Sequence, residues 1–373
     1  MKNPFKGDPL IAVLTFLLSA FGIVAVYSAS FYVAGLDYGN KYYYAVKQGG
    51  GFIVGAIGFM VTSRIDYHKY FGKGKIMYAV AALLLALVFI PFLSVEVYGA
   101  RRWLNLGFFT VQPSEIAKFA YVFMVAEYFA ADMGRAKTLK GILPPLAAGG
   151  LLCVLIVLEP NMSITVCVGI LVFTLLFLCG ARLKHFMLIF IPALMAVPVL
   201  IAVEPYRLKR LSAFLDPWAS PRGEGYQLLQ SLYGLGSGGL FGVGLFNSRQ
   251  KFRFLPFSES DFILSVIGEE IGFFGTLIFF AAMVTLILRG IKAASKSKDF
   301  YGYILAMGII TVYGVQVIIN ALVVTGSMPP TGLPLPFISA GNTSLIVFMS
   351  AFGVLYNVSK GGGSGKTKKN RIK

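Results

Sequence analysis

Asp261 is the residue with the clearest chemical potential, because it stands where a long polar segment meets an apolar run. Residues 204–261 are rich in Gly, Pro, aromatic and charged residues, and the apolar run begins at residue 262. A carboxylate at such a junction is partly desolvated yet reachable from water, and burial moves its pKa towards the range of a general base. Aspartate is also a good helix N-cap. These features alone favour neither interpretation over the other.

Two further charged pairs stand in or beside apolar runs, where a charge is costly and indicates function. Glu115 and Lys118 are three residues apart, which places them on one helix face. They form either a self-neutralising pair that joins neighbouring helices, or a cation held for an anionic substrate and tuned by Glu115. Arg101 and Arg102 precede Trp103, as in an interfacial anchor. Two guanidinium groups could equally clamp a pyrophosphate.

The segment 204–261 carries further cations, which would suit a polyanionic, lipid-linked substrate. Solvation of an amphipathic surface helix would explain them equally well. They are Arg207, Lys209, Arg210, Arg249, Lys251 and Arg253.

Four polar residues of later apolar runs favour structural roles. Glu269 and Glu270 are adjacent, so their side chains would point about 100° apart on a helix. We therefore do not expect both to face one site, and we expect helix capping or pairing with a buried cation. Gln316 and Asn320 lie four residues apart and predict interhelical hydrogen bonds.

The elements that position these residues must lie in a membrane. Of the 373 residues, 57% are hydrophobic and 13% are charged, whereas a soluble domain carries about 25% charged residues. The recurring apolar runs are long enough to span a bilayer as helices and too long for barrel strands. The sequence predicts an all-α, polytopic protein with about ten transmembrane helices, over 9–30, 45–62, 76–93, 113–131, 142–159, 162–180, 186–203, 262–289, 301–326 and 342–359.

The charge distribution predicts the orientation. Lys and Arg gather in one set of short connections and at both termini, whereas the short connections of the opposite side carry only Lys41, Lys47, Arg101 and Arg102. The rule that positive charge stays inside makes both termini cytoplasmic and 204–261 an extracytoplasmic loop between helices seven and eight. Residues 1–360 form one transmembrane domain, and 361–373 a flexible basic tail against anionic lipid. We expect no nucleic-acid partner despite the net charge of +17.

The sequence contains few residues that could serve disulfide, zinc or histidine chemistry. The cysteines Cys153, Cys167 and Cys179 all lie in apolar runs, so no disulfide or zinc framework is readable. His68 and His185 are the two histidines, which leaves little for a Ser-His-Asp triad or a histidine-rich metal site.

Seven motifs make the chain resemble the SEDS family (shape, elongation, division and sporulation proteins) of RodA, FtsW and SpoVE. They run through most of the chain in the family's order. Two of them, GARRW and NSRQK, are more similar to the FtsW/SpoVE branch. The motifs are GARRW at 99–103, QPSEIAK at 112–118, GEGYQLLQSL at 223–232, GSGGLFGVGL at 236–245, NSRQK at 247–251, DFILSVIGEE at 261–270 and TGLPLPFIS at 331–339.

The resemblance implies ten spans and a function. Members of the family are peptidoglycan glycosyltransferases that polymerise lipid II on the outer face of the bacterial cytoplasmic membrane with a class B penicillin-binding protein, a transpeptidase. The family's essential aspartate falls on Asp261, which favours the catalytic interpretation. A divalent cation such as Mg²⁺ or Mn²⁺ could assist, as in other pyrophosphate chemistry. We expect the substrate to be bound by Arg101, Arg102, Lys118, Glu115, Arg249 and Lys251.

The chain departs from the family's pattern at three places near the expected site. Where the family usually reads LPExHTDF before the aspartate, this chain reads LPFSESDF, with Phe257, Glu259 and Ser260 at the changed positions. Where the family commonly has QPDxG, this chain has Glu159-Pro160-Asn161-Met162-Ser163. The usual SYGGSS of the last outside loop is replaced at 339–344.

Two other functions remain open. A transporter that flips lipid II would also place polar residues inside a bundle, although the polar clusters here gather at the outer end. A non-enzymatic scaffold that recruits the transpeptidase is the second alternative. The most informative experiment incubates the purified protein, with and without its partner, with labelled lipid II and assays for glycan chains.

Overall fold

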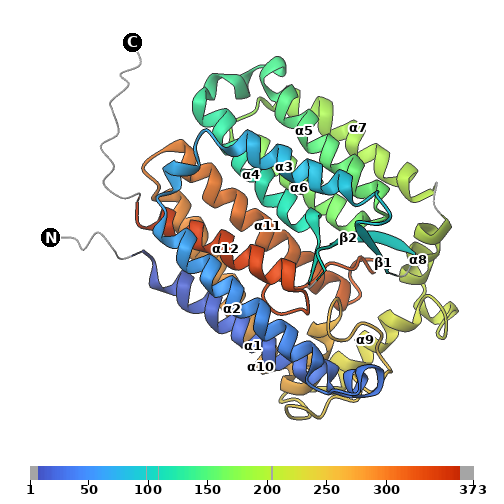
Figure 1. The fold of residues 1–373 in the computed structure, drawn as a ribbon. Helices are drawn as coiled ribbons and strands as arrows, with labels where there is room; N and C mark the ends of the chain where they lie inside the picture. The colour runs from blue at the N-terminus through green and yellow to red at the C-terminus, as the bar shows by residue number, and fades with distance from the viewer. Residues whose placement is uncertain (1–6, 98, 108, 203–204, 362–373) are drawn as a thin grey trace.

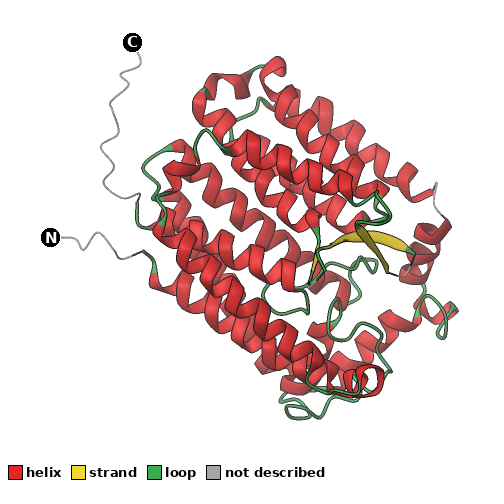
Figure 2. Ribbon diagram, in the orientation of Figure 1, coloured by secondary structure: helices red, strands yellow, loops and turns green. Residues whose placement is uncertain are grey.

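The structure is a computed structural model that describes residues 7–97, 99–107, 109–202 and 205–361. The predicted basic tail lies, from residue 362 onward, outside the described residues. Where it is described, the chain is a bundle of helices with one small sheet at one end (Figures 1 and 2). The predicted all-α membrane fold is therefore confirmed in its main architecture.

The elements follow one another as in the predicted order. The helices are α1 (Pro9–Tyr38), α2 (Tyr43–Arg64), α3 (Gly74–Leu87), α4 (Pro113–Ala131), α5 (Leu139–Leu158), α6 (Met162–Leu178), α7 (Leu183–Ala202), α8 (Pro205–Leu215), α9 (Tyr226–Ser237), α10 (Ile263–Ser295), α11 (Phe300–Val324) and α12 (Asn342–Ser359). Short 3-10 helices lie at Tyr67–Tyr70, Met133–Lys137 and Pro217–Ala219, and the strands are β1 (Ser94–Val97), β2 (Ala100–Asn105) and β3 (Thr110–Val111).

Each of the ten predicted spans overlaps a helix: α1 to α7 and α10 to α12. In the described part of the chain, six of these helices are long and apolar enough to cross a membrane on their own: α1, α2, α5, α10, α11 and α12. Helices α3, α6 and α7 are apolar but contain shorter qualifying stretches. Large apolar side chains such as Ile53, Leu188 and Ile278 point outward, as they do where lipid is the solvent.

Helices that are distant in sequence close the bundle. The first helix α1 packs against α2, α10 and α12, while α11 packs against α4, α6 and α10. The start of α1 and the end of α12 lie at one end of the bundle, and the sheet, α8 and α9 lie at the other (Figure 1). At the first end, the Asp8 amide donates to the Ser359 hydroxyl at 2.9 Å, and Arg289 of α10 pairs with the Asp8 carboxylate at 2.6 Å.

The prediction that the third span continues to residue 93 is wrong, and the small sheet that follows α3 was not predicted. Helix α3 ends at Leu87, and the chain turns into an antiparallel sheet of order β1-β2-β3. Residues 88–93 are almost all apolar, so hydropathy does not register the end of the helix. Arg101, Arg102 and Trp103 of the motif GARRW, expected as an interfacial anchor or a pyrophosphate clamp, lie in the central strand β2.

The segment 204–261, predicted to be an extracytoplasmic loop, is more ordered than a loop. It contains the basic helix α8, a 3-10 helix and α9 before a series of turns leads to Asp261. Helix α8 agrees with the predicted surface-helix alternative for part of the cations. The side chain of Arg207 lies outside the described residues.

Helix α10 is broken at Gly272, whose φ of 67° and ψ of −172° are not helical. A glycine-rich turn packs on the break: the Val243 amide donates to the Glu269 carbonyl at 3.0 Å and the Gly244 amide to the Glu270 carbonyl at 3.1 Å. These bonds satisfy carbonyl groups that the broken helix leaves without partners, as a membrane interior requires. The short first half of α10 directly follows Asp261.

Candidate active site

Asp261 lies two residues before α10 and is partly exposed. The N-cap of α10 is Phe262, and no side chain makes a capping hydrogen bond there. The capping interpretation of Asp261 is therefore not supported. Its catalytic role stays a prediction.

The last outside loop fixes the backbone around Asp261. The side-chain amide of Asn320 donates both to the Asp261 carbonyl and to the Leu333 carbonyl, each at 2.8 Å. The Ser339 hydroxyl donates to the Ser260 carbonyl at 2.6 Å. The residues before α10 and the loop before α12 are thus held together at the backbone of Asp261. Asn320 was predicted to bond between helices, and it instead holds together the backbone at Asp261 and at Leu333.

Gly332 allows this loop to pass close to the carboxylate. A Cβ atom at residue 332 would lie 3.1 Å from Oδ2 of Asp261, and the φ of Gly332 is +80°. Glycine is the residue that adopts this backbone without strain. The position therefore leaves room beside Asp261.

Burial sets the chemistry of Asp261. It raises the pKa of the carboxyl group from 3.8 to about 6, and the charge of Arg210, a hydrogen bond with Ser260 and the charge of Arg102 oppose the rise. Burial also raises the pKa of the neighbouring Glu259. A carboxylate that titrates near neutrality is suited to accept a proton from a hydroxyl group.

Arg101 and Arg102, predicted to bind substrate together, separate on strand β2. Arg101 pairs with Glu96 of β1 at 3.1 Å on an exposed face. Arg102 donates from Nε to the Glu159 carbonyl at 3.2 Å and from its terminal NH2 group to the Pro160 carbonyl at 2.5 Å. Successive residues of a strand point to opposite faces, and the charge of Arg102 is the one that acts on Asp261.

Arg210 is a site residue that the sequence placed only among the general cations. It lies on α8 and donates to the Pro330 carbonyl of the last outside loop at 3.0 Å. Its charge is the largest favourable one acting on the Asp261 carboxylate. No pattern in the sequence indicated this role, because only the folded chain brings α8 to that loop.

The Glu115–Lys118 pair is buried between helices. The two side chains are 2.8 Å apart and almost completely buried. Glu115 also accepts from the Ser344 hydroxyl of α12 at 2.9 Å, and the Lys118 ammonium lies 5.5 Å from the centre of the Phe348 ring. This placement favours the helix-joining alternative over direct substrate binding.

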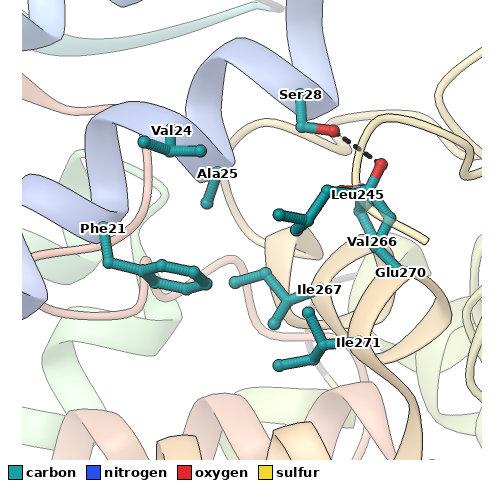
Figure 3. A pocket seen from close by; sticks show the side chains of 9 residues that line it. All are labelled: Phe21, Val24, Ala25, Ser28, Leu245, Val266, Ile267, Glu270 and Ile271. Carbon is teal, nitrogen blue, oxygen red and sulfur yellow. Dashed lines mark hydrogen bonds between the residues drawn. The ribbon is translucent and has the colours of Figure 1, made fainter. Parts of the chain in front are cut away.

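Lys251 is likewise inside the protein, which contradicts its predicted contact with substrate. It is fully buried and pairs with Glu270 at 3.0 Å. Glu270 also accepts from the Ser28 hydroxyl of α1 at 2.6 Å. Figure 3 shows this bond at the edge of a small cavity of about 10 Å³ between α1 and α10. The pairing with a buried cation was predicted for these carboxylates.

Glu269 engages the same segment as Glu270, although we did not expect the two to share a site. It accepts from the Ser248 hydroxyl at 2.5 Å and from the Arg249 amide at 3.1 Å. The segment 248–251 curves around the first half of α10 and reaches both carboxylates. The Arg249 side chain is exposed, so the prediction that it binds substrate stays a prediction.

Among the described residues, no three His, Cys, Asp or Glu side chains are grouped closely enough to hold an ion. The assistance of a divalent cation stays a prediction.

Comparison with known proteins agrees with the fold. The family model of FtsW, RodA and SpoVE, described as cell cycle protein, matches residues 8–362. Stage V sporulation protein E of Bacillus subtilis is 37% identical over 355 residues, which are 95% of this chain and 97% of that protein. A probable peptidoglycan glycosyltransferase FtsW of Coxiella burnetii is 38% identical over 356 residues, 94% of this chain and 96% of that protein.

Solved structures lead to the same family. A chain of a peptidoglycan synthase complex that coordinates polymerization and crosslinking superposes with a TM-score of 0.79 at 27% identity, covering 95% of this chain and 98% of that one. The rod shape determining protein RodA of Thermus thermophilus gives a TM-score of 0.70 at 25% identity, covering 95% and 97%. The chain therefore belongs to the FtsW, RodA and SpoVE family of cell cycle proteins, the SEDS family, on its FtsW/SpoVE branch.

Proposed function

We propose that the protein is a peptidoglycan glycosyltransferase that polymerises lipid II at the outer face of the bacterial cytoplasmic membrane. The observation that carries the proposal is Asp261, a partly exposed carboxylate with a pKa raised to about 6 and no helix-capping role. Relatives that match nearly the whole chain are named for this activity.

In the proposed reaction, Asp261 accepts the proton of a sugar hydroxyl on the acceptor glycan. The freed oxygen attacks the anomeric carbon of the donor sugar and forms the new glycosidic bond. The bond from that carbon to the phosphate oxygen breaks, and undecaprenyl pyrophosphate leaves with the electron pair. Positioned general bases contribute about 10²–10⁴-fold to such steps.

Arg102 and Arg210 supply positive charge for the leaving pyrophosphate. Both act on Asp261, and both are held by backbone carbonyls that position their guanidinium groups. Arginine binds phosphate oxygens through two parallel hydrogen bonds. A Mg²⁺ or Mn²⁺ ion bound to the pyrophosphate would add charge, but no step above depends on it.

The orientation and partner belong to the same proposal. The sheet, α8 and α9 occupy one end of the bundle, and charges from β2 and α8 act on Asp261. We assign this end to the extracytoplasmic side, with both termini cytoplasmic. The similar chain of known structure works in a complex that couples polymerization to crosslinking. A class B penicillin-binding protein, which crosslinks peptides, is the partner we propose.

The test is polymerisation of labelled lipid II by the purified protein in lipid nanodiscs, with and without that partner. We expect Asp261→Asn to lose about 10²–10⁴-fold in rate, because Asn keeps the size of Asp but cannot accept the proton. Asp216→Asn is the matched control: Asp216 lies in the same outside segment and caps a 3-10 helix, a role that Asn fills.

The outcomes separate this function from its alternatives. Wild-type polymerisation by Asp261→Asn, at equal abundance and thermal stability, would overturn the assignment. If the wild-type protein moved lipid II from one leaflet of a vesicle membrane to the other without forming glycan, it would be a flippase. If it bound the transpeptidase and did neither, it would be a scaffold.

A further inference from the structure

The turn between α5 and α6 holds a carboxyl group that the proposed reaction does not use. Glu159 follows α5, and its side chain is 1% exposed. Neither of its carboxylate oxygens has a hydrogen-bond partner within the described residues. Buried polar groups are normally paired, so this carboxyl group needs an explanation.

The carboxyl group belongs to a turn that reads Glu159-Pro160-Asn161. The side chain of Asn161 accepts from the Ile164 amide at 3.4 Å and caps α6. The third residue of the turn is therefore used as a neutral helix cap, whereas the first carries a buried carboxyl group.

The same turn holds Arg102 of the Asp261 site. The backbone carbonyls of Glu159 and Pro160 accept from the Arg102 guanidinium. Within the described chain, Arg102 is the charged group that acts on the Glu159 carboxyl, and it also acts on Asp261. The charge of one guanidinium group therefore acts on two carboxyl groups, those of Glu159 and Asp261.

We infer that Glu159 is a second titratable group of this site, whose carboxyl group controls how much positive charge Arg102 offers to the substrate's pyrophosphate. This inference rests on the proposed function. When Glu159 is protonated, the positive charge of Arg102 attracts the pyrophosphate at full strength. When Glu159 is ionised, its negative charge offsets that of Arg102 and weakens substrate binding.

The protonation state follows from the surroundings. Burial raises the pKa of Glu159 from 4.5 to about 8, although the charge of Arg102 opposes the rise. The group is therefore a neutral acid at neutral pH and ionises under mildly alkaline conditions. Ionisation should then raise the KM for lipid II, with a smaller effect on kcat.

The experiment measures KM for lipid II between about pH 7 and about pH 9, on either side of the transition. For the wild type we expect a rise of about tenfold, the usual worth of one charge-assisted hydrogen bond. Glu159→Gln, which is uncharged and of the same shape, should give a flat profile. Glu96→Gln removes the carboxylate partner of the neighbouring Arg101 and should keep the alkaline rise.

Two more measurements keep the test decisive. Arg102→Gln should raise KM at neutral pH and also abolish the alkaline rise, even if Glu159→Gln does not fold. Infrared difference spectra should show one buried carboxylic acid in the wild type that ionises near pH 8 and is missing in Glu159→Gln. An alkaline rise that persists in Glu159→Gln or Arg102→Gln would overturn the inference. A wild type that shows the infrared band but no polymerisation would overturn the proposed function instead.

Discussion

At the scale of single residues, the protonation of Asp261 sets the acid side of the pH profile. The carboxyl group must be ionised to accept a proton, and its pKa is raised to about 6. We expect kcat to fall about tenfold for each pH unit below that value, measured as lipid II polymerisation. A profile that stays flat down to about pH 5 would show that another group accepts the proton.

The same shift predicts an effect of Asp261 on stability. Between the ordinary pKa of 3.8 and about 6, the folded state holds a proton that the unfolded state has released, so stability falls as pH rises through this range. Above about pH 6, Asp261→Asn should therefore raise the free energy of unfolding, by at most ~3 kcal/mol. Thermal unfolding in detergent at several pH values measures this, and the difference should vanish below about pH 4.

The buried pair Lys251–Glu270 predicts loss of stability without loss of substrate affinity. Lys251→Met leaves the Glu270 carboxylate buried without its cation, which costs about 3–5 kcal/mol. The double variant Lys251→Met/Glu270→Gln should recover much of this loss, since no charge remains buried. Thermal unfolding gives the stabilities, and KM for lipid II should stay within about twofold in the folded double variant. Arg249→Gln, at an exposed side chain, is the control for the stability measurement alone, because Arg249 stays a predicted substrate-binding residue.

The sequence indicated which residues could take part in the chemistry better than it indicated which groups those residues contact. Asp261 could be singled out because its place at the junction of a polar segment and an apolar run is a local property. The division between Arg101 and Arg102 depends on strand β2, which the apolar composition conceals. The roles of Arg210 and Glu159 depend on contacts between segments far apart in sequence, which periodicity cannot reveal.

At the scale of elements, the ten spans could be predicted because hydrophobicity decides them, whereas their irregularities could not. The end of α3 at Leu87 occurs inside an apolar stretch. The break of α10 at Gly272 leaves the apolar pattern unchanged. Both follow from backbone contacts rather than from composition.

The break in α10 predicts two glycines that cannot be replaced. A Cβ atom at Gly242 would lie 2.1 Å from the Glu270 carbonyl oxygen, and one at Gly272 would lie 2.2 Å from the Gly242 nitrogen. Each also has a positive φ. We expect Gly242→Ala or Gly272→Ala to cost about 2–4 kcal/mol and to lower polymerisation, because the first half of α10 follows Asp261.

Gly236→Ala is the matched control for these variants. Gly236 lies in α9, and a Cβ atom there meets nothing within 4 Å. Alanine is about 1 kcal/mol more favourable than glycine inside a helix, so this variant should be as stable as the wild type or more so. Equal thermal stability of all three variants would refute the close packing at the break.

At the scale of the whole molecule, the exposed apolar surface predicts where a single-span partner binds. On α10 and α11, Phe273, Ile278 and Ile318 are 59%, 72% and 56% exposed. We expect a photocrosslinking residue at Ile278 or Ile318 to capture the transpeptidase in membranes. Leu188 on α7, which is 62% exposed, is the control. Capture from Leu188 alone would place the partner on the opposite side of the bundle.

The closure of α1 against late helices has a consequence for biosynthesis. Ser28 bonds to Glu270, 242 residues later, and the Asp8 amide bonds to Ser359, 351 residues later. At ~5–20 residues per second, a ribosome needs about 10–50 s to reach Glu270 after making Ser28. During that time α1 has its neighbour α2, but the Ser28 hydroxyl lacks its carboxylate partner in the membrane. A chain truncated before α10 therefore leaves the face of α1 that carries Ser28 uncovered.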